Sequence, residues 1–407
     1  MIRSVLVVLL LVLPAAAAAQ QEPPASAPTR VDISRGGLTI SSGVNSLTIG
    51  ARFQFRWTVE DREKWNSDST GAGRGEDDGP LSQFDVPRMR VTLRGGVFRP
   101  WLRYDFQFDF SRTSGEASSK IKDALIEIRP PDRPFHLSLG QFKAPFGLQQ
   151  LTSSGRLQFV DRAITDAKFN PSRDTGVMLS GTFAGRRGGY HAGVFNGSGE
   201  AVRQNTRAPL WVGRVFVQPL GAYALSEGSS DAGERTVVHL GAAARTGKQI
   251  RGRTAAGVVE DADNETAVSL EFALKGARFY STAEHFWMTN ERENPVVAPD
   301  VRSRGFHAQA GYMLVPRRLE AGVLYARITP DTTIDGAAVT ELRAVAGYYW
   351  HAHGLKLQAD AGTVGFGANF TRLPATARLG LPSLGPRLVS GRSLHDRQLR
   401  VQMQVAF

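Results

Sequence analysis

The last eleven residues of the chain, 397–407, alternate between apolar and polar side chains. Because successive side chains of a strand point to opposite faces, this segment is predicted to be a strand with one apolar and one polar face. The apolar face would carry Leu399, Val401, Met403, Val405 and Phe407. The same alternation recurs along most of the chain in segments of about ten residues, the length of a tilted strand that crosses a membrane.

Sixteen such segments are predicted, and an even number is typical of a bacterial outer-membrane barrel. Their connections alternate between short and long, and only 219–236 is long where a tight turn is due. Lipid contains no water to pair with backbone groups, so strands can span it only as a closed barrel. The predicted fold class is therefore all-β, a 16-stranded antiparallel transmembrane β-barrel with short periplasmic turns, long extracellular loops and room for an aqueous channel. The predicted strands are 47–59, 86–98, 101–111, 121–129, 135–142, 175–184, 189–196, 210–218, 237–245, 267–274, 278–287, 305–314, 318–328, 341–350, 354–363 and 397–407.

The N-terminus predicts export from the cytoplasm. In residues 1–19, Arg3 precedes a short apolar run, and alanines supply a cleavage site that ends at Ala19, so this segment is expected to be a secretory signal peptide. Residues 20–36 are rich in Pro, Ala and Ser and are expected to form a flexible N-terminal segment, followed by the outer-membrane barrel over 37–407. The chain has no cysteine, which excludes a disulfide framework and a lipid-modified cysteine.

The formal net charge of the chain is +11, and this balance bears on the solutes it would meet. A strongly basic protein usually contacts anions, and nucleic acid is one such partner. Export past the inner membrane argues against nucleic acid. The expected partners are therefore small anions, either phosphate-like or chloride, together with outer-membrane lipid.

Arginines recur on the polar faces of the first three predicted strands. If the apolar faces meet lipid, these polar faces line the pore, where rows of guanidinium groups favour anions over cations. Arginine also remains charged and can donate two hydrogen bonds to an oxyanion. The alternative is that they only solvate one face or pair with nearby carboxylates. The predicted pore-lining residues on the strands are Arg52, Arg56, Arg88, Arg90, Arg94, Arg103 and Asp105.

The very long connection 143–174 is a candidate constriction loop, because a long loop can fold into a wide barrel and narrow it. Within it, Lys143, Ser153 and Arg156 are predicted to face passing anions. The alternative is an ordinary surface loop with scattered charges.

Three motifs resemble the phosphate-selective porin O and P family. They are Gly140-Gln141-Phe142-Lys143-Ala144-Pro145-Phe146-Gly147-Leu148, the following Leu151-Thr152-Ser153-Ser154, and Gly193-Val194-Phe195-Asn196-Gly197. The resemblance implies a homotrimer of sixteen-stranded barrels, each with a pore narrowed by an inward loop and lined by an arginine ladder. Phosphate-specific members of that family place lysines after the glycine-leucine pair. Here residues 149–156 contain no lysine, so general anion preference is expected rather than tight phosphate binding.

The leading functional hypothesis is a porin in the outer membrane of a Gram-negative bacterium that forms a water-filled, anion-preferring channel for small solutes. Selective uptake of phosphate or another oxyanion through a defined site is a second hypothesis. A third is an exported all-β enzyme or carbohydrate-binding protein without a pore. No enzyme activity, cofactor or metal site is expected, because the histidines are scattered and no Gly-x-Ser-x-Gly elbow occurs.

Overall fold

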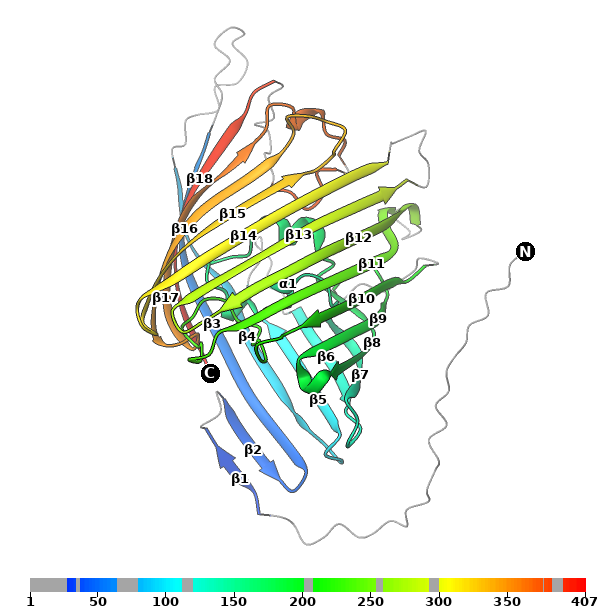
Figure 1. Ribbon diagram of the computed structural model, residues 1–407, viewed down its shortest axis with the longest axis vertical. Helices are drawn as coiled ribbons and strands as arrows, with labels where there is room; N and C mark the ends of the chain where they lie inside the picture. The colour runs from blue at the N-terminus through cyan, green and yellow to red at the C-terminus, as the bar shows by residue number, and fades with distance from the viewer. Residues whose placement is uncertain are drawn as a thin grey trace, which may run out of the picture.

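The computed structural model is an antiparallel β-barrel (Figure 1). Sixteen strands, β3–β18, each pair with their neighbours in sequence, and β18 pairs with β3 to close the ring. The predicted fold class is confirmed. The structure describes residues 28–33, 37–63, 80–111, 120–200, 208–253, 259–292, 300–375, 377–382 and 391–407.

All sixteen predicted strands are present, including 121–129 and 210–218. The barrel strands are β3 (Asn45–Arg62), β4 (Leu81–Gly96), β5 (Leu102–Asp109), β6 (Lys120–Ile128), β7 (Phe135–Lys143), β8 (Arg173–Phe183), β9 (Gly188–Phe195), β10 (Leu210–Val217), β11 (Val237–Arg253), β12 (Val259–Lys275), β13 (Phe279–Glu291), β14 (Val301–Val315), β15 (Leu319–Thr329), β16 (Val339–His351), β17 (Leu355–Phe366) and β18 (Leu394–Ala406). Strands β11 and β12 extend beyond their predicted bounds at the long-loop end. Residues 246–253 are mostly polar, so apolar alternation could not reveal that part of the hairpin.

The two faces of the barrel differ as the alternation predicts. Phe53 and Phe55 of β3 are 43% and 42% exposed on the outer face, whereas Gln54 between them is fully buried on the inner face. An exposed band of apolar side chains on the outer face is what contact with hydrocarbon requires. Among the described residues, no helix is both long and apolar enough to cross a membrane.

A proline within β4 has a local structural reason. The β3–β4 register shifts between the pairs Gln54–Arg88 and Arg56–Asp85, so two residues of β4, Val86 and Pro87, lie opposite one residue of β3. Proline cannot donate a ladder hydrogen bond, and a bulge is one of the few strand positions that tolerate it. The extra residue of the bulge therefore places Arg88, which follows Pro87, on the inner face.

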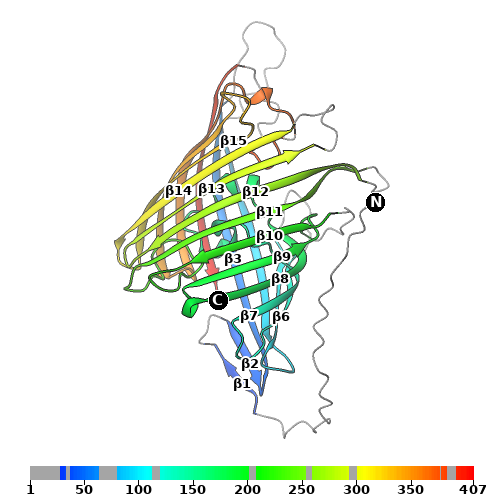
Figure 2. The ribbon, with the colours of Figure 1, turned by 45° about the vertical axis from the view of Figure 1, so that its right-hand side comes forward.

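Two short strands at the N-terminus were not predicted. They are β1 (Arg30–Asp32) and β2 (Leu38–Ser42), which pair with each other, while β2 pairs with the first residues of β3. They project beyond the short-turn end of the barrel (Figure 2). Strand β1 lies in the segment expected to be flexible. The predicted signal peptide, 1–19, lies outside the described residues.

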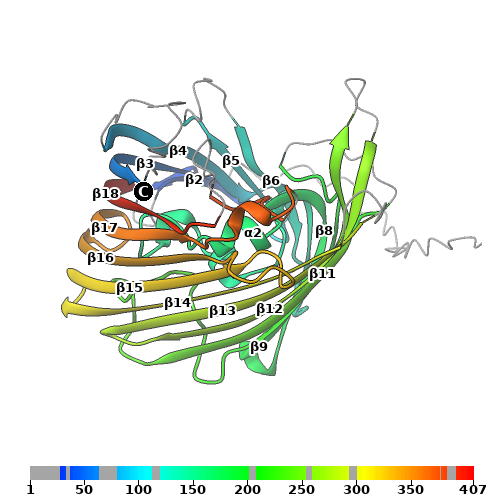
Figure 3. The same ribbon diagram turned by 90° about the horizontal axis from the view of Figure 1, so that it is seen from above.

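Part of the chain lies inside the barrel (Figure 3). The connection between β7 and β8, residues 144–172, is called the inner loop here. It contains α1 (Leu148–Leu151), the 3-10 turn η1 (Ser154–Arg156) and α2 (Thr165–Phe169), and α2 lies within the ring of strands. Phe146 and Phe169 of this loop pack on Phe286 of β13 in a buried apolar cluster. The remaining 3-10 turns are η2 (Ala184–Arg186) and η3 (Phe370–Arg372).

Candidate functional site

The inner loop begins on the wall of β13. Both carboxylate oxygens of Glu284 accept hydrogen bonds from the first backbone N–H groups of α1, at 2.6 Å from Leu148 and 2.7 Å from Gln149. These N–H groups have no partner within the helix, so a wall carboxylate satisfies them and also complements the partial positive charge of the helix start. Gly147, with φ +76°, makes the turn into α1.

The same wall holds the rest of the loop. The Val160 N–H donates to Asp360 of β17 (3.0 Å), and the Ile164 N–H donates to Glu341 of β16 (2.9 Å). A loop buried in a barrel needs partners for its backbone groups, and carboxylates on the inner faces of β13, β16 and β17 supply them. The loop therefore lies against the β13–β18 half of the barrel and faces the β3–β8 half.

Asp161 joins the loop to three arginines of the wall. Arg56 of β3 donates to both carboxylate oxygens at 2.8 and 3.0 Å, Arg88 of β4 donates at 3.1 Å, and Arg400 of β18 donates at 3.3 Å. Burial alone would raise the pKa of Asp161, but these guanidinium groups overcome that effect and hold the pKa well below the ordinary aspartate range. The junction keeps an excess of positive charge beside the loop.

A second contact joins the loop to arginines that lie opposite each other across β3 and β4. Arg52 and Arg90 are directly paired in the register, and both donate to the Ser154 hydroxyl, at 2.9 and 3.2 Å. Like charges at such a pair repel. Arg90 also donates to Asp109 at 2.7 Å, whereas no described carboxylate accepts a hydrogen bond from Arg52. Arg52 therefore carries a positive charge that is not directly neutralised, at the edge of the inner loop.

A cavity of about 610 Å³ opens beside this contact. It is bounded by the inner faces of β3–β6, by η1, by the turn after β16 and by the C-terminal Phe407. Five of the residues predicted from sequence line it together: Arg52, Arg94, Asp105, Ser153 and Arg156. The Arg156 side chain is exposed, and no described residue accepts a hydrogen bond from it. Arg94 lies directly opposite Asp105 in the β4–β5 register.

The other predicted site residues lie elsewhere. Arg56, Arg88 and Arg90 are at the two loop junctions described above. Arg103 is exposed on the inner face of β5 at its short-turn end, opposite Glu127, and is not part of the cavity.

Lys143 differs from its predicted place beside passing anions. Its ammonium donates to the carbonyl oxygens of Gln150, Leu151 and Thr152 at 2.6, 3.2 and 3.1 Å. These carbonyls end α1 without partners in the helix, and a cation satisfies them and the helix dipole. All three ammonium donors are used, so Lys143 holds the loop instead of facing a solute.

Sequence reasoning missed three residues at the centre of the site: Ser154, Asp161 and Arg400. Ser154 follows Ser153 in one of the family-like motifs, but only the fold shows which of the two hydroxyls reaches the arginines of β3 and β4. Asp161 lies far from its arginines in sequence. Arg400 is on the polar face of the last strand, and the alternation of 397–407 does place it inside the barrel.

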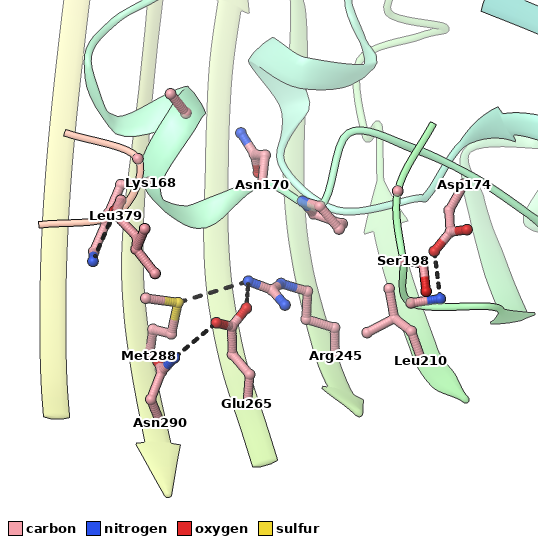
Figure 4. A pocket seen from close by; sticks show the side chains of 15 residues that line it. Lys168, Asn170, Asp174, Ser198, Leu210, Arg245, Glu265, Met288, Asn290 and Leu379 are labelled. Atoms are coloured by element: carbon pink, nitrogen blue, oxygen red, sulfur yellow. Dashed lines mark hydrogen bonds and ion pairs between the residues drawn. The ribbon is translucent and has the colours of Figure 1, made fainter. Parts of the chain in front are cut away.

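A smaller cavity of about 250 Å³ lies between α2 and strands β10–β13 (Figure 4). Arg245 points toward Glu265 and Met288, with 2.6 Å to the Glu265 carboxylate and 3.7 Å to the Met288 sulfur. Lys168 of α2 donates to the carbonyl of Leu379 at 3.1 Å. The Lys168 contact attaches α2 to the β17–β18 connection, so the inner loop is also held from the long-loop end.

The comparisons with known proteins agree with this architecture. The family model described as phosphate-selective porin O and P matches residues 48–359. An anion-selective porin from Comamonas acidovorans superposes with a TM-score of 0.58 at 13% identity, covering 89% of this chain and 100% of that one. The outer membrane channel DcaP of Acinetobacter baumannii gives 0.54 at 12% identity, with 89% and 97% covered. A trimer form of OmpT, an outer membrane protein of Vibrio cholerae, gives 0.50 at 10%, with 88% and 99% covered. Among curated proteins, none matches the chain by sequence.

Proposed function

The chain belongs to the phosphate-selective porin O and P family, a family of Gram-negative outer-membrane barrels, and on that premise we propose that it is an anion-preferring porin. Its pore passes between the inner loop and the β3–β6 wall, where the cavity beside Arg52 lies. The observation that carries the proposal is the position of Arg52, Arg94 and Arg156 on one cavity, with Arg52 and Arg156 free of hydrogen bonds to carboxylates among the described residues.

Electrostatics gives this arrangement its direction of selectivity. A guanidinium in a narrow aqueous passage lowers the energy of an anion and raises that of a cation, and the effect grows where the walls lower the dielectric constant. Asp105 offsets part of the charge of Arg94 because the two are register partners. Asp123 and Asp231 also line the cavity, and each is paired with a cation: Asp123 with Arg173 at 2.9 Å and Asp231 with Lys275 at 3.1 Å. The charges of Arg52 and Arg156 therefore remain, and they favour small anions such as chloride and phosphate.

Preference for phosphate over chloride is expected to be weak. Lysines are absent from residues 149–156, and Lys143 is occupied by the loop backbone. One feature favours some oxyanion binding: Arg52 and Arg90 converge on a single hydroxyl, so a tetrahedral oxyanion could receive donors from both in place of Ser154.

Recordings from planar bilayers test both points. We expect current steps whose reversal potential in a KCl gradient shows chloride to be more permeant than potassium. Millimolar phosphate should reduce the chloride current only slightly. Preference for potassium would refute the anion porin, whereas strong block by phosphate would establish the selective oxyanion channel instead.

A homotrimer is part of the proposal. It is supported by family membership and by the trimer form among the similar structures. Outer-membrane extraction followed by size-exclusion chromatography in detergent checks the mass, and a mass of one barrel would contradict it. Heat-modifiable migration on gels separates this barrel from an exported soluble enzyme or carbohydrate-binding protein, which would show none.

A further inference from the structure

The connection between β10 and β11, residues 218–236, enters the barrel from the short-turn end, where every other described connection has at most six residues. We call it the lower segment. Its middle is buried although it is polar: Ser226, Glu227 and Ser229 are 0%, 1% and 0% exposed. Tyr223 of this segment packs in an apolar cluster with Leu148, Ala273 and Tyr280. That cluster does not account for the buried polar side chains, whose burial requires specific partners inside the barrel.

Glu227 meets the inner loop with its side chain. One carboxylate oxygen accepts from the Gln149 amide at 3.0 Å, and the other accepts from the backbone N–H of Gln158 at 2.9 Å and from the amide of Gln309 at 2.9 Å. Gln149 and Gln158 flank η1 in the inner loop, and Gln309 is on the wall at β14. The carboxylate therefore connects both ends of η1 to the barrel.

Glu227 also meets the loop with its backbone. Its N–H donates to the carbonyl oxygen of Arg156 at 2.8 Å, and its own carbonyl accepts from the His353 ring at 3.1 Å. His353 belongs to the tight turn after β16. The position of Arg156, whose guanidinium faces the cavity, thus depends on a residue that reaches it from the opposite side of the membrane.

Hydrogen bonds to the barrel wall hold the lower segment in place. The Ser229 N–H donates to Glu320 of β15 at 3.0 Å, and Lys275 of β12 donates to Ser226 at 2.6 Å and to Asp231 at 3.1 Å. Partners on two separate strands fix the segment in one arrangement.

We propose that the lower segment is a strut that sets the position of the constriction, with Glu227 as the positioning residue and Arg156 as the pore residue it places. The inference rests on the proposed channel function. It assigns the width and selectivity of the pore partly to a periplasmic connection instead of to the inner loop alone.

Two substitutions test the strut. Glu227→Ala removes all three side-chain acceptor contacts. Glu227→Gln keeps the size of the side chain but replaces one acceptor oxygen by an amide, which faces donors, so it disturbs the same junction if the alanine variant does not assemble. Glu234→Gln is the matched control, because Glu234 is exposed in the same segment and loses the same charge.

The readouts are single-channel conductance, current noise in the open state and the chloride-to-potassium permeability ratio, with heat-modifiable migration to verify the barrel. In the Glu227 variants we expect a conductance change on the order of twofold, more noise and a lower permeability ratio, since Arg156 loses its fixed place. Glu234→Gln should match the wild type.

The outcomes separate this inference from the proposed function. A wild-type channel without anion preference refutes the proposed function whatever the variants do. An anion-preferring wild type with Glu227 variants that assemble and show its conductance, noise and selectivity refutes the strut alone. Changes of equal size in Glu234→Gln also refute it, because they would arise from charge and not from the buried contacts.

Discussion

Arg52 allows the sharpest test of the channel electrostatics, because its charge is not paired directly with a carboxylate. Substitution by glutamine removes the charge but keeps an amide that can still donate to a nearby oxygen. The Arg52 guanidinium lines the cavity and lies 2.9 Å from the Ser154 hydroxyl. We take about 5 Å as its separation from a passing anion. At that separation in water with a dielectric constant of about 80, unit charges interact by about 0.8 kcal/mol.

That energy corresponds to roughly a fourfold change in the local anion concentration. Protein walls reduce the dielectric constant and would make the interaction energy larger than this value. Salt screens part of the interaction and makes the energy smaller. Cations experience the opposite change. Arg52→Gln removes a roughly fourfold enrichment of anions and a roughly fourfold depletion of cations together. The chloride-to-potassium permeability ratio should therefore fall by roughly 16-fold at low salt, and by less as salt screens the charge.

The measurement is the reversal potential in a planar bilayer under a KCl gradient, at two ionic strengths. Arg278→Gln serves as the control, since Arg278 is exposed in the turn between β12 and β13 and loses the same charge away from the pore. An Arg52 variant with the wild-type permeability ratio would show that solutes do not pass beside Ser154, and the reasoning about the pore path would fail.

Three further outcomes are expected. Asp161→Asn should loosen the inner loop, because removing the charge of a partly exposed carboxylate that three arginines share costs about 1–3 kcal/mol locally. Open-channel noise should rise, and anion preference should increase. The pKa of Asp161 is lowered in the folded protein, so its stabilisation of the inner loop is fully present above the free aspartate pKa of about 4. That stabilisation is lost only as the pH falls through the lower folded pKa. Wild-type noise should therefore stay constant from pH 7 to about pH 4, and a rise within that range would contradict the contact of Asp161 with the arginines. Lys143→Met should increase noise but change selectivity less than Arg52→Gln, since its ammonium holds carbonyls of α1; an equal loss of selectivity would restore it to the anion path. Gly140→Ala should abolish the heat-modifiable folded form, because Gly140 has φ +128° and an added Cβ would meet the Ala124 carbonyl oxygen, and normal assembly would disprove that packing.

Much of the fold follows from local sequence because the strand period is a local property. Each barrel strand needs one face for lipid and one for water, so about ten residues of alternation suffice to identify it. Alternation does not identify the long-loop ends of β11 and β12, because those ends are mostly polar. The short strand β2 was missed for a related reason: it adds to the edge of β3 outside the membrane-spanning part.

The candidate site was predictable by face but not by partner. Alternation and charge place Arg52, Arg88 and Arg90 on the inner wall, and the structure has them there. The sequence pattern does not indicate that Asp161 neutralises part of this charge, because the loop that carries Asp161 has no periodic pattern. Ser153 was predicted, but Ser154 contacts Arg52, for the same reason. The direction of each hydroxyl depends on how the η1 turn is oriented, which no periodic pattern indicates.

The sequence by itself determined the barrel, its strand number, its two faces and the arginine-rich inner wall, since each depends on side-chain order within one strand or on the count of strands. Only the tertiary structure decided how the space inside is divided. That division depends on hydrogen bonds between segments far apart in the chain, such as Asp161 with Arg400 and Glu227 with Gln158. Residues with ordinary local surroundings acquire those partners only when the ring of strands closes around them.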